Sequence, residues 1–353
     1  MHGWLVIDKP VGPGSTDIVS KVKRALRDGG YPKVKVGHGG TLDPLASGVL
    51  PIALGEATKL AGRMLDADKV YDFTIRFGEQ TDTLDAEGMV VATSEVRPTL
   101  AEVEAVLGRF TGEIEQVPPV YSALKVDGKR AYDLARAGAE VEMKTRRVTV
   151  YGLKLLPGTG RGTSEAGGGA GDGATGAGGA DPSTTAFGGV LERDRVPLTR
   201  SWTAGGGPKP QHPPRSGEEL EEITLTARVS KGTYIRSLTR DIAQALGTVG
   251  YVTMLRRLKA GPFTLDGAIS LDKLTELANA RTLEQTLLPL TAGLDDIPAL
   301  SVTPDQARAL RQGREVIGTA AKPGLYLATD GSVPVALVEL HGDRLRVVRG
   351  FNI

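Results

Sequence analysis

The chain has 353 residues, a mass of 37.1 kDa and a formal net charge of +1, which is enough for one large domain or two smaller ones. The absence of cysteine excludes disulfides, iron–sulfur clusters and cysteine nucleophiles. The four histidines are too scattered to suggest a metal site: His2, His38, His212 and His341. Because no apolar run approaches the roughly 18 residues of a membrane span and the N-terminus MHGWLVIDKP does not resemble a signal peptide, we expect a soluble, cytoplasmic protein without membrane contact.

The N-terminal part begins with a predicted strand at Trp4–Ile7, which ends at the Pro- and Gly-rich turn 10–14. A helix follows, whose apolar residues recur on one face, with Ser15 or Thr16 as its N-cap. Residues 37–48 form a glycine-punctuated loop.

The middle of the chain mixes strands and helices without a regular βαβ rhythm. Strands are predicted at 70–77, 147–156 and 223–229. One helix opens at the capping box Thr99-Leu-Ala-Glu102, and another runs from Ile235 to Leu246 with Gly247 just beyond its end. This order favours an α+β fold with a largely antiparallel mixed sheet flanked by helices.

Residues 157–217 differ in composition from the rest of the chain. These 61 residues include 17 Gly and 7 Pro, and their sparse apolar side chains show no period. Such a segment cannot bury enough apolar surface to offset its ordering entropy. We therefore predict a disordered insertion in a hairpin connection, which divides a main domain into residues 1–156 and 218–290.

A second module is predicted at residues 295–353. Thr303 caps a helix with Pro304 at its first position and Gln306 at its third. Short strands follow at 325–328, 333–340 and 345–348. The module is thus a small β-rich domain, and none of its motifs indicates catalysis.

Asp43 lies in the most unusual motif, Gly37-His-Gly-Gly-Thr-Leu-Asp-Pro-Leu-Ala-Ser-Gly48. The glycines allow a ligand to approach the backbone closely, and Pro44 favours an extended conformation at Asp43. Such an aspartate can be a nucleophile, a general base or a metal ligand. It can equally be an ordinary Asp-Pro turn initiator.

A second motif, Val229-Ser-Lys-Gly-Thr-Tyr-Ile-Arg-Ser-Leu238, leaves a strand, turns at Gly232 and enters a helix. Its cations and aromatic ring lie near a helix N-terminus, where backbone N–H groups favour phosphate. Alternatively, Arg236 pairs with a carboxylate in a two-point hydrogen bond, or Arg236 and Tyr234 are merely surface and half-buried residues.

In a third motif, Lys69-Val-Tyr-Asp-Phe-Thr-Ile-Arg-Phe-Gly78, Tyr71 shares one strand face with Phe73 and Ile75. Tyr71 is therefore either a core residue or an aromatic ring that stacks on a nucleobase.

Charge is segregated along the chain. Residues 1–36 carry seven Lys and Arg against three acids, residues 228–259 seven against one, and residues 79–119 two against nine. Either the two basic segments supply phosphate contacts, or the segregation is that of an ordinary solvated surface.

Together these motifs resemble those of the bacterial tRNA pseudouridine-55 synthases, the TruB family. The matching segments occur in the family's order and cover most of residues 3–263 outside the insertion. They read LVIDKPVGPGSTDIVSKVKR, VGHGGTLDPLASGVLPIALGEATKL, KVYDFTIRFGEQTDTLDAEG, QVPPVYSALKVDGKRAYDLARAG, RVTVYGL, VSKGTYIRSLTRDIAQALG and YVTMLRRLKAGPF. The main departure is the long insertion, since this connection is short in the family.

The resemblance implies a pseudouridine-synthase fold for the main domain and a PUA-like RNA-binding domain for residues 295–353. It makes Asp43 the catalytic carboxylate, Tyr71 the aromatic ring on the target base, and Arg236 the partner of the carboxylate. It places Tyr234 and Leu255 in the uridine pocket and His38 in the RNA loop that the target base has left. Lys9, in the DKP-type segment, is expected to support the site.

The implied activity is isomerisation of uridine-55 in the T-loop of tRNA, with the T-arm stem-loop as partner, flipping of the target base and no obligate protein partner. Formula and charge do not change in this reaction, so neither a redox cofactor nor ATP is expected, and the composition of Cys and His predicts no metal site. Asp43 attacks C1′ or C6, or assists elimination to a glycal, and the sequence does not choose.

Three other interpretations compete. A non-catalytic tRNA-binding chaperone of the same fold would not need Asp43, Tyr71 and Arg236 together. A synthase working on ribosomal RNA in a guide-RNA particle is disfavoured because long basic terminal extensions are absent. A nucleotide enzyme with a phosphate-binding loop is disfavoured because the sequence has neither GxxxxGK[ST] nor a strand-linked GxGxxG.

Overall fold

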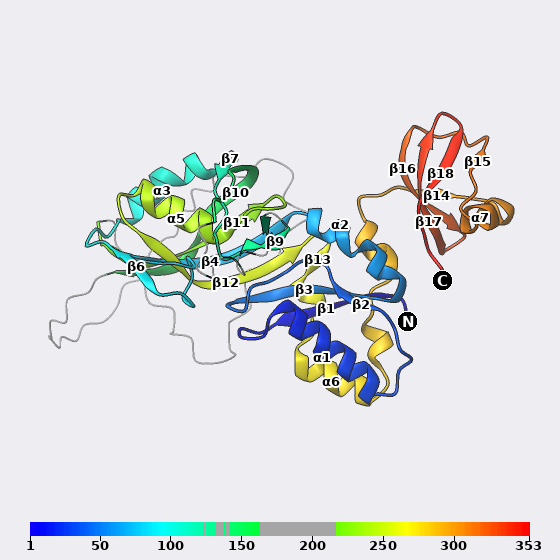
Figure 1. Ribbon diagram of the computed structural model, residues 1–353, viewed down its shortest axis with the longest axis horizontal. Coiled ribbons are helices and arrows are strands. Elements are labelled where there is room, and N and C mark those ends of the chain that lie inside the picture. The colour runs from blue at the N-terminus through cyan, green and yellow to red at the C-terminus, as the bar shows by residue number, and fades with distance from the viewer. Residues whose placement is uncertain (123, 127, 132–133, 135–136, 138–140, 163–216) are drawn as a thin grey trace, which may run out of the picture.

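The computed structural model describes residues 1–353 except 123, 127, 132–133, 135–136, 138–140 and 163–216. Within these residues the strands form a nine-stranded sheet, a five-stranded sheet near the C-terminus and two small two-stranded sheets (Figure 1). None of the helices among the described residues is both long enough and apolar enough to cross a membrane.

The nine-stranded sheet is the scaffold of the main domain. Its order is β1-β3-β12-β4-β11-β10-β7, with β2 paired to β3 and β13 paired to β12. Only β12 and β3 pair in parallel within it, so the prediction of a largely antiparallel mixed sheet is confirmed. The bounds are β1 (Gly3–Lys9), β2 (Val36–His38), β3 (Ala46–Leu54), β4 (Lys69–Phe77), β7 (Gly112–Gln116), β10 (Arg146–Gly162), β11 (Leu220–Val229), β12 (Gly250–Ala260) and β13 (Phe263–Thr264).

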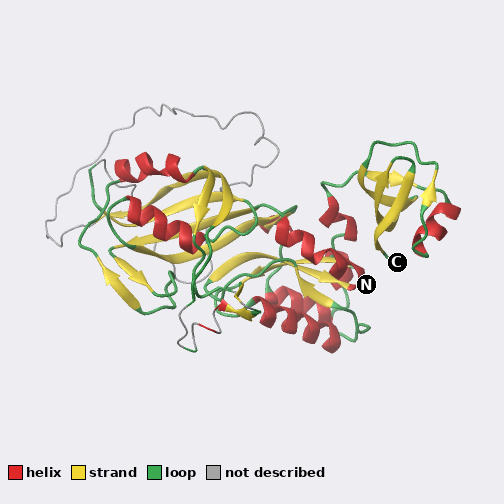
Figure 2. Cartoon of the chain, turned by 45° about the horizontal axis from the view of Figure 1, so that its top comes forward, coloured by secondary structure: helices red, strands yellow, loops and turns green. Residues whose placement is uncertain are grey.

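Two pairs of helices pack along this sheet. Helices α1 (Ser15–Asp28) and α6 (Leu271–Asn279) lie side by side next to β1 and β3, and α3 (Leu100–Leu107) and α5 (Ile235–Ala245) lie along the other half (Figure 2). All four contribute buried side chains to one core cluster. The shorter elements are β5 (Glu79–Thr81), β6 (Val90–Thr93), β8 (Lys125–Val126), β9 (Lys129–Arg130), α2 (Ala61–Asp66), η1 (Gly55–Leu60), η2 (Gly108–Phe110), η3 (Leu265–Gly267), η4 (Leu283–Thr286) and η5 (Leu290–Leu294).

The helix termini confirm most of the predicted caps. Thr99 caps α3 by accepting the Glu102 N–H, and Gly247 follows α5 with a φ of +74°. The predicted cap of α1 is wrong: Gly14 is the N-cap, and its N–H donates to the Asp17 carboxylate at 2.9 Å. Ser15 is instead a buried residue of the first turn, which frees its hydroxyl for another partner.

Strands β10 and β11 are antiparallel neighbours, so residues 163–216 connect two adjacent strands. Strand β10 continues to Gly162, six residues into the range predicted as insertion. The bulk of that predicted insertion lies outside the described residues.

The C-terminal sheet has its own apolar cluster and joins the main domain through a second one. Phe351, Leu327 and Leu337 pack there with Trp4 and Met64. The backbone N–H of Asn352 donates to Glu56 at 2.8 Å, and Lys59 donates to the Gly350 carbonyl at 2.9 Å. The bounds are β14 (Ala299–Ser301), α7 (Pro304–Arg311), β15 (Val316–Ile317), β16 (Gly324–Asp330), β17 (Val333–His341) and β18 (Arg344–Gly350).

Candidate active site

Asp43 lies in the loop between β2 and β3, and its carboxylate faces α5. The distance from Asp43 Oδ2 to Arg236 Nη2 is 3.0 Å. The Asp43 side chain is 41% exposed, whereas that of Arg236 is 7% exposed. The Asp43 carboxylate is thus open to solvent, while its cationic partner is buried inside the protein.

The Arg236 guanidinium contacts more groups than the sequence suggested. Nη2 also donates to the Tyr121 carbonyl at 2.8 Å, and Nη1 donates to the Thr83 carbonyl at 2.9 Å and to Asp85 Oδ2 at 3.1 Å. The expected two-point hydrogen bond to one carboxylate is therefore replaced by contacts with two carboxylates. Four partners leave the guanidinium little freedom to rotate.

Asp85 is the site residue that the sequence analysis missed. It is buried, and its Oδ1 accepts the Thr83 hydroxyl at 2.6 Å and the Glu87 N–H at 3.1 Å. The preceding Leu84 has a φ of +62°, which is rare and strained for a non-glycine residue. The acidic segment around Asp85 was visible in the sequence, but nothing there marks one of its carboxylates as buried.

Lys9 also contacts the loop that carries Asp43. It is fully buried, and its Nζ donates to the carbonyls of Pro10 at 2.9 Å and Pro44 at 3.3 Å. Burial lowers the pKa of Lys9 from 10.5 to about 8, although the nearby Asp43 charge opposes the shift. Lys9 therefore binds the residue that directly follows Asp43.

Tyr71 and Leu255 lie on two neighbouring strands of the central sheet, β4 and β12. Tyr71 of β4 packs against the core cluster on the same face as Phe73 and Ile75, as predicted. Leu255 of β12 pairs with Phe73 on one side and with Ala46 of β3 on the other. Strand β12 thus lies between the strand that carries Tyr71 and the strand that follows Asp43.

Tyr234 is the N-cap residue of α5, two positions before Arg236. The Gln116 side chain accepts the Tyr234 N–H at 2.8 Å and donates to its carbonyl at 3.1 Å. Burial raises the pKa of the Tyr234 phenol, and the Asp43 charge contributes to that increase. The phenol therefore stays protonated near the site.

His38 ends strand β2, five residues before Asp43. It is half-buried, and burial together with the Arg257 charge lowers the pKa of its imidazole. A neutral aromatic ring consequently borders the same loop.

Comparison with known proteins places the chain in one family. Residues 27–164 match the TruB family pseudouridylate synthase (N terminal domain), and residues 236–295 match the tRNA pseudouridylate synthase B C-terminal domain. Proteins named tRNA pseudouridine synthase B are 55% identical in Novosphingobium aromaticivorans, covering 100% of this chain and 98% of that protein, and 52% identical in Zymomonas mobilis, covering 100% and 96%. The chain belongs to the TruB family. It is accordingly an isomerase, a pseudouridine synthase.

Solved structures show the same fold at lower identity. A chain from an H/ACA RNP bound to a substrate RNA containing 2'-deoxyuridine has a TM-score of 0.62 and 21% identity, covering 99% of this chain and 85% of that one. A chain from an archaeal box H/ACA sRNP complex has a TM-score of 0.61 and 20% identity, and the match covers 99% of this chain and 86% of that one. Residues 296–353 lie outside both family matches, and the PUA-like assignment of residues 295–353 stays a prediction.

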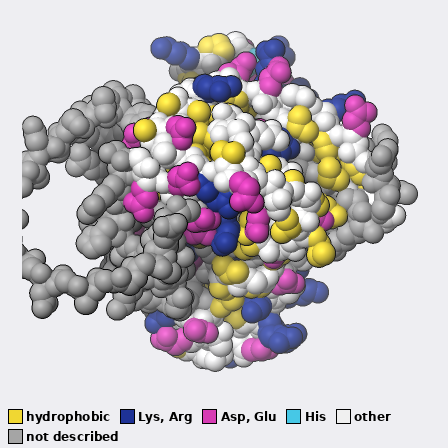
Figure 3. Space-filling view, turned by 90° about the vertical axis from the view of Figure 1, so that its left-hand side faces the viewer, with side chains coloured by type: hydrophobic (Ala, Val, Ile, Leu, Met, Phe, Trp, Pro, Cys, Tyr) yellow, Lys and Arg dark blue, Asp and Glu magenta, His cyan; other side chains and the backbone are white. Residues whose placement is uncertain are grey.

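The basic segment 228–259 does not form a free cationic surface. Arg228 pairs with Asp68 at 3.3 Å, Lys231 with Asp66 at 3.0 Å, and Arg256 with Asp8 at 2.8 Å. Figure 3 shows Lys and Arg side chains interspersed with Asp and Glu at one end of the molecule. Phosphate contacts from this segment would therefore have to compete with internal ion pairs.

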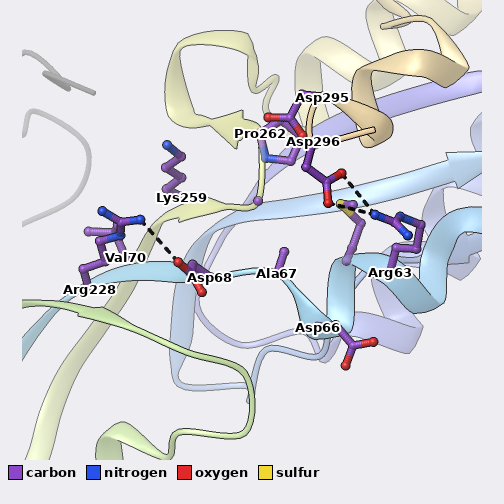
Figure 4. A pocket seen from close by; sticks show the side chains of 12 residues that line it. Arg63, Asp66, Ala67, Asp68, Val70, Arg228, Lys259, Pro262, Asp295 and Asp296 are labelled. Carbon is purple, nitrogen blue, oxygen red and sulfur yellow. Dashed lines mark hydrogen bonds and ion pairs between the residues drawn. The ribbon is translucent and has the colours of Figure 1, made fainter. Parts of the chain in front are cut away.

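A hollow of about 470 Å³ lies between α2, β4, the β12–β13 turn and residues 295–296. Figure 4 shows its walls, where Arg63 pairs with Asp296 and Arg228 with Asp68. Asp43 is not among the residues that line this hollow, and four of its charged side chains are paired as Arg63–Asp296 and Arg228–Asp68, so we assign the hollow no role in the reaction. In the described part of the chain, no three His, Asp or Glu side chains gather to hold a metal ion.

Proposed function

We propose that this protein converts the uridine at position 55 in the T-loop of tRNA to pseudouridine, with Asp43 as the catalytic carboxylate. The substrate class follows from the relatives, which are named for tRNA. The observation that carries the residue assignment is the exposed Asp43 carboxylate 3.0 Å from the buried Arg236 guanidinium. Since tRNA is the proposed substrate, the cytoplasm is the expected compartment.

The reaction breaks the N-glycosidic bond, turns the base and rejoins it through C5. A carboxylate beside the sugar and the base serves each of the three routes: attack on C1′, attack on C6 or elimination to a glycal. In each of them Arg236 holds the carboxylate in place through a charge-assisted contact. No redox cofactor or ATP enters, because atoms and charge balance without them.

The target uridine lies within a folded RNA loop, so it must be flipped out at a cost of a few kcal/mol. Tyr71 would stack on the detached base, and base–aromatic stacking contributes about 1–3 kcal/mol. Tyr234 and Leu255 would line the uridine pocket, and His38 would occupy the space that the base leaves. Stacking of this kind retains the free base between the two bond events.

The test is incubation of the purified protein with an unmodified tRNA transcript, followed by mapping of pseudouridine at each position. We expect modification at position 55 alone. An isolated T-arm stem-loop should be modified equally well, because the T-arm is the part of the tRNA that the protein is proposed to bind. The purified protein should suffice, because no protein partner is proposed. The matched control is a transcript with cytidine at position 55. Binding without any pseudouridine would favour the chaperone interpretation, and modification elsewhere would overturn the proposed site.

A further inference from the structure

Ser15 has an unusual set of contacts for a residue at the start of a helix. It does not cap α1, and its side chain is buried. Its Oγ accepts the Leu42 N–H at 2.8 Å and donates to the Leu42 carbonyl at 3.0 Å. One hydroxyl therefore satisfies both backbone groups of the residue directly before Asp43.

Arg257 holds the two residues before Leu42. It is buried on β12, and its guanidinium donates to the carbonyls of Thr41 at 3.3 Å, Gly40 at 3.4 Å and Val49 at 2.8 Å. Its backbone also lies against β3, where Arg257 pairs with Gly48 and a Cβ at Gly48 would collide with the Arg257 carbonyl oxygen. Arg257 thus fixes the loop to the central sheet.

The carbonyls of the two residues after Leu42 are also bonded. The Asp43 carbonyl accepts the Ala46 N–H at 3.1 Å, and the Pro44 carbonyl accepts the Gly12 N–H at 2.9 Å. Every backbone carbonyl from residue 40 to residue 44 therefore has a hydrogen-bond donor. The partly exposed Asp43 carboxylate is therefore carried by an anchored stretch of backbone.

From these contacts we propose that Ser15 and Arg257 are positioning residues, which clamp the backbone of residues 40–42 and so set the position of the Asp43 carboxylate for the isomerisation. This inference rests on the proposed role of Asp43. Neither side chain touches the reacting atoms. Their effect is on geometry, and a displacement of about 1 Å can cost about 10²-fold in rate.

The proposal predicts a specific kinetic signature for Ser15→Ala. Losing the hydroxyl leaves the N–H and the carbonyl of Leu42 without a partner, so the loop relaxes and Asp43 shifts relative to Arg236. The single-turnover rate constant at saturating T-arm RNA should fall by about 10- to 10²-fold, while the Kd for that RNA changes less than threefold. Ser15→Thr, which keeps the hydroxyl, should recover most of the rate.

Ser20→Ala is the matched control, since Ser20 lies on the same helix and its exposed hydroxyl donates to the Thr16 carbonyl at 3.1 Å. It should react like the wild type. Arg257→Lys provides a second test, because it keeps the charge and removes the guanidinium that spans the loop carbonyls. It should lower the rate constant and leave RNA affinity unchanged.

A full rate constant in Ser15→Ala, or a loss that appears only in RNA affinity, would overturn the proposal. So would loss of the fold in both Ser15→Ala and Arg257→Lys, since the residues would then belong simply to the core. An Asp43→Asn variant assayed in parallel separates the two proposals. If Asp43→Asn is inactive and Ser15→Ala is fully active, only the positioning role of Ser15 and Arg257 is overturned. If Asp43→Asn is active, the proposed function itself is overturned.

Discussion

The loop 39–45 and the turn between β5 and β6 both present a carboxylate to Arg236. The two carboxylates differ in solvent exposure and in the number of their hydrogen-bond partners. Asp43 in the loop is 41% exposed and meets the guanidinium at one nitrogen. Asp85 in the turn is 4% exposed, and the Thr83 hydroxyl and the Glu87 N–H bind it in addition to Arg236. Asp85 is therefore the more firmly held partner of the arginine, whereas the Asp43 carboxylate remains accessible to solvent.

Charge balance supports this division. Two carboxylates, Asp43 and Asp85, lie beside two buried cations, Arg236 and Lys9. A buried cation without a counter-charge is costly, so Asp85 allows Arg236 to remain inside the protein while Asp43 faces outward. The pKa of Glu87, at the edge of this cluster, is also raised. Burial is the main cause, and the negative charges of Asp85 and Asp43 add to it.

Arg236→Lys should have the largest effect, because Arg236 contacts both Asp43 and Asp85. A lysine cannot contact two carboxylates and two carbonyls at once, so the Asp43 carboxylate loses its fixed position. We expect the single-turnover rate constant to fall by at least about 10²-fold. Arg240→Lys, one turn later on α5, is the control and should react normally; equal losses in both variants would mean that the helix, not the guanidinium, matters.

Asp85→Asn should have a smaller effect and sharpens the comparison. An amide cannot accept the Thr83 hydroxyl, the Glu87 N–H and the Arg236 N–H as a carboxylate does. We expect the free energy of unfolding to fall by about 1–3 kcal/mol and the rate constant to fall by about tenfold. Urea unfolding measures the free energy of unfolding, and single-turnover kinetics measures the rate constant. The control is Asp82→Asn at an exposed position of the same turn, which should change neither the free energy of unfolding nor the rate constant. If Asp85→Asn also left both unchanged, Arg236 would not depend on Asp85 for its position.

The smallest effect is a pH dependence at Lys9. Its pKa falls from 10.5 to about 8 on burial, so between these values the unfolded chain binds more protons than the folded protein. Raising the pH across this window therefore stabilises the folded state through Lys9. The free energy of unfolding of the wild type should rise relative to Lys9→Met by on the order of 1 kcal/mol per pH unit. A difference that stays flat from pH 8 to 10 would contradict the pKa shift.

Much of the fold could be predicted because local signals agree with it. The alternation around Tyr71 predicted β4, and the capping box at Thr99 predicted α3. Short elements such as β14 and β15 were missed, since two or three residues carry no measurable period. The cap of α1 was assigned to Ser15 or Thr16 because both can cap a helix, whereas tertiary contact with Leu42 decides what Ser15 does.

The site was predictable only where a motif carried it. Asp43 and Arg236 were paired through a family resemblance, although their contact depends on residues nearly two hundred positions apart. Asp85 could not be chosen among its acidic neighbours, because its burial results from the packing of α5 against the turn. Segment charge alone left two interpretations open, and ion pairs with aspartates elsewhere in the chain neutralise part of the basic segment 228–259.

The most direct test of the account is the single-turnover reaction of Asp43→Asn at saturating T-arm RNA, with the Kd for that RNA measured alongside. The account predicts RNA binding like that of the wild type and no detectable pseudouridine, because the amide keeps the shape of the side chain and loses its charge and nucleophilicity. Pseudouridine formed at a rate near that of the wild type would remove Asp43 from the chemistry and contradict the assignment of this site.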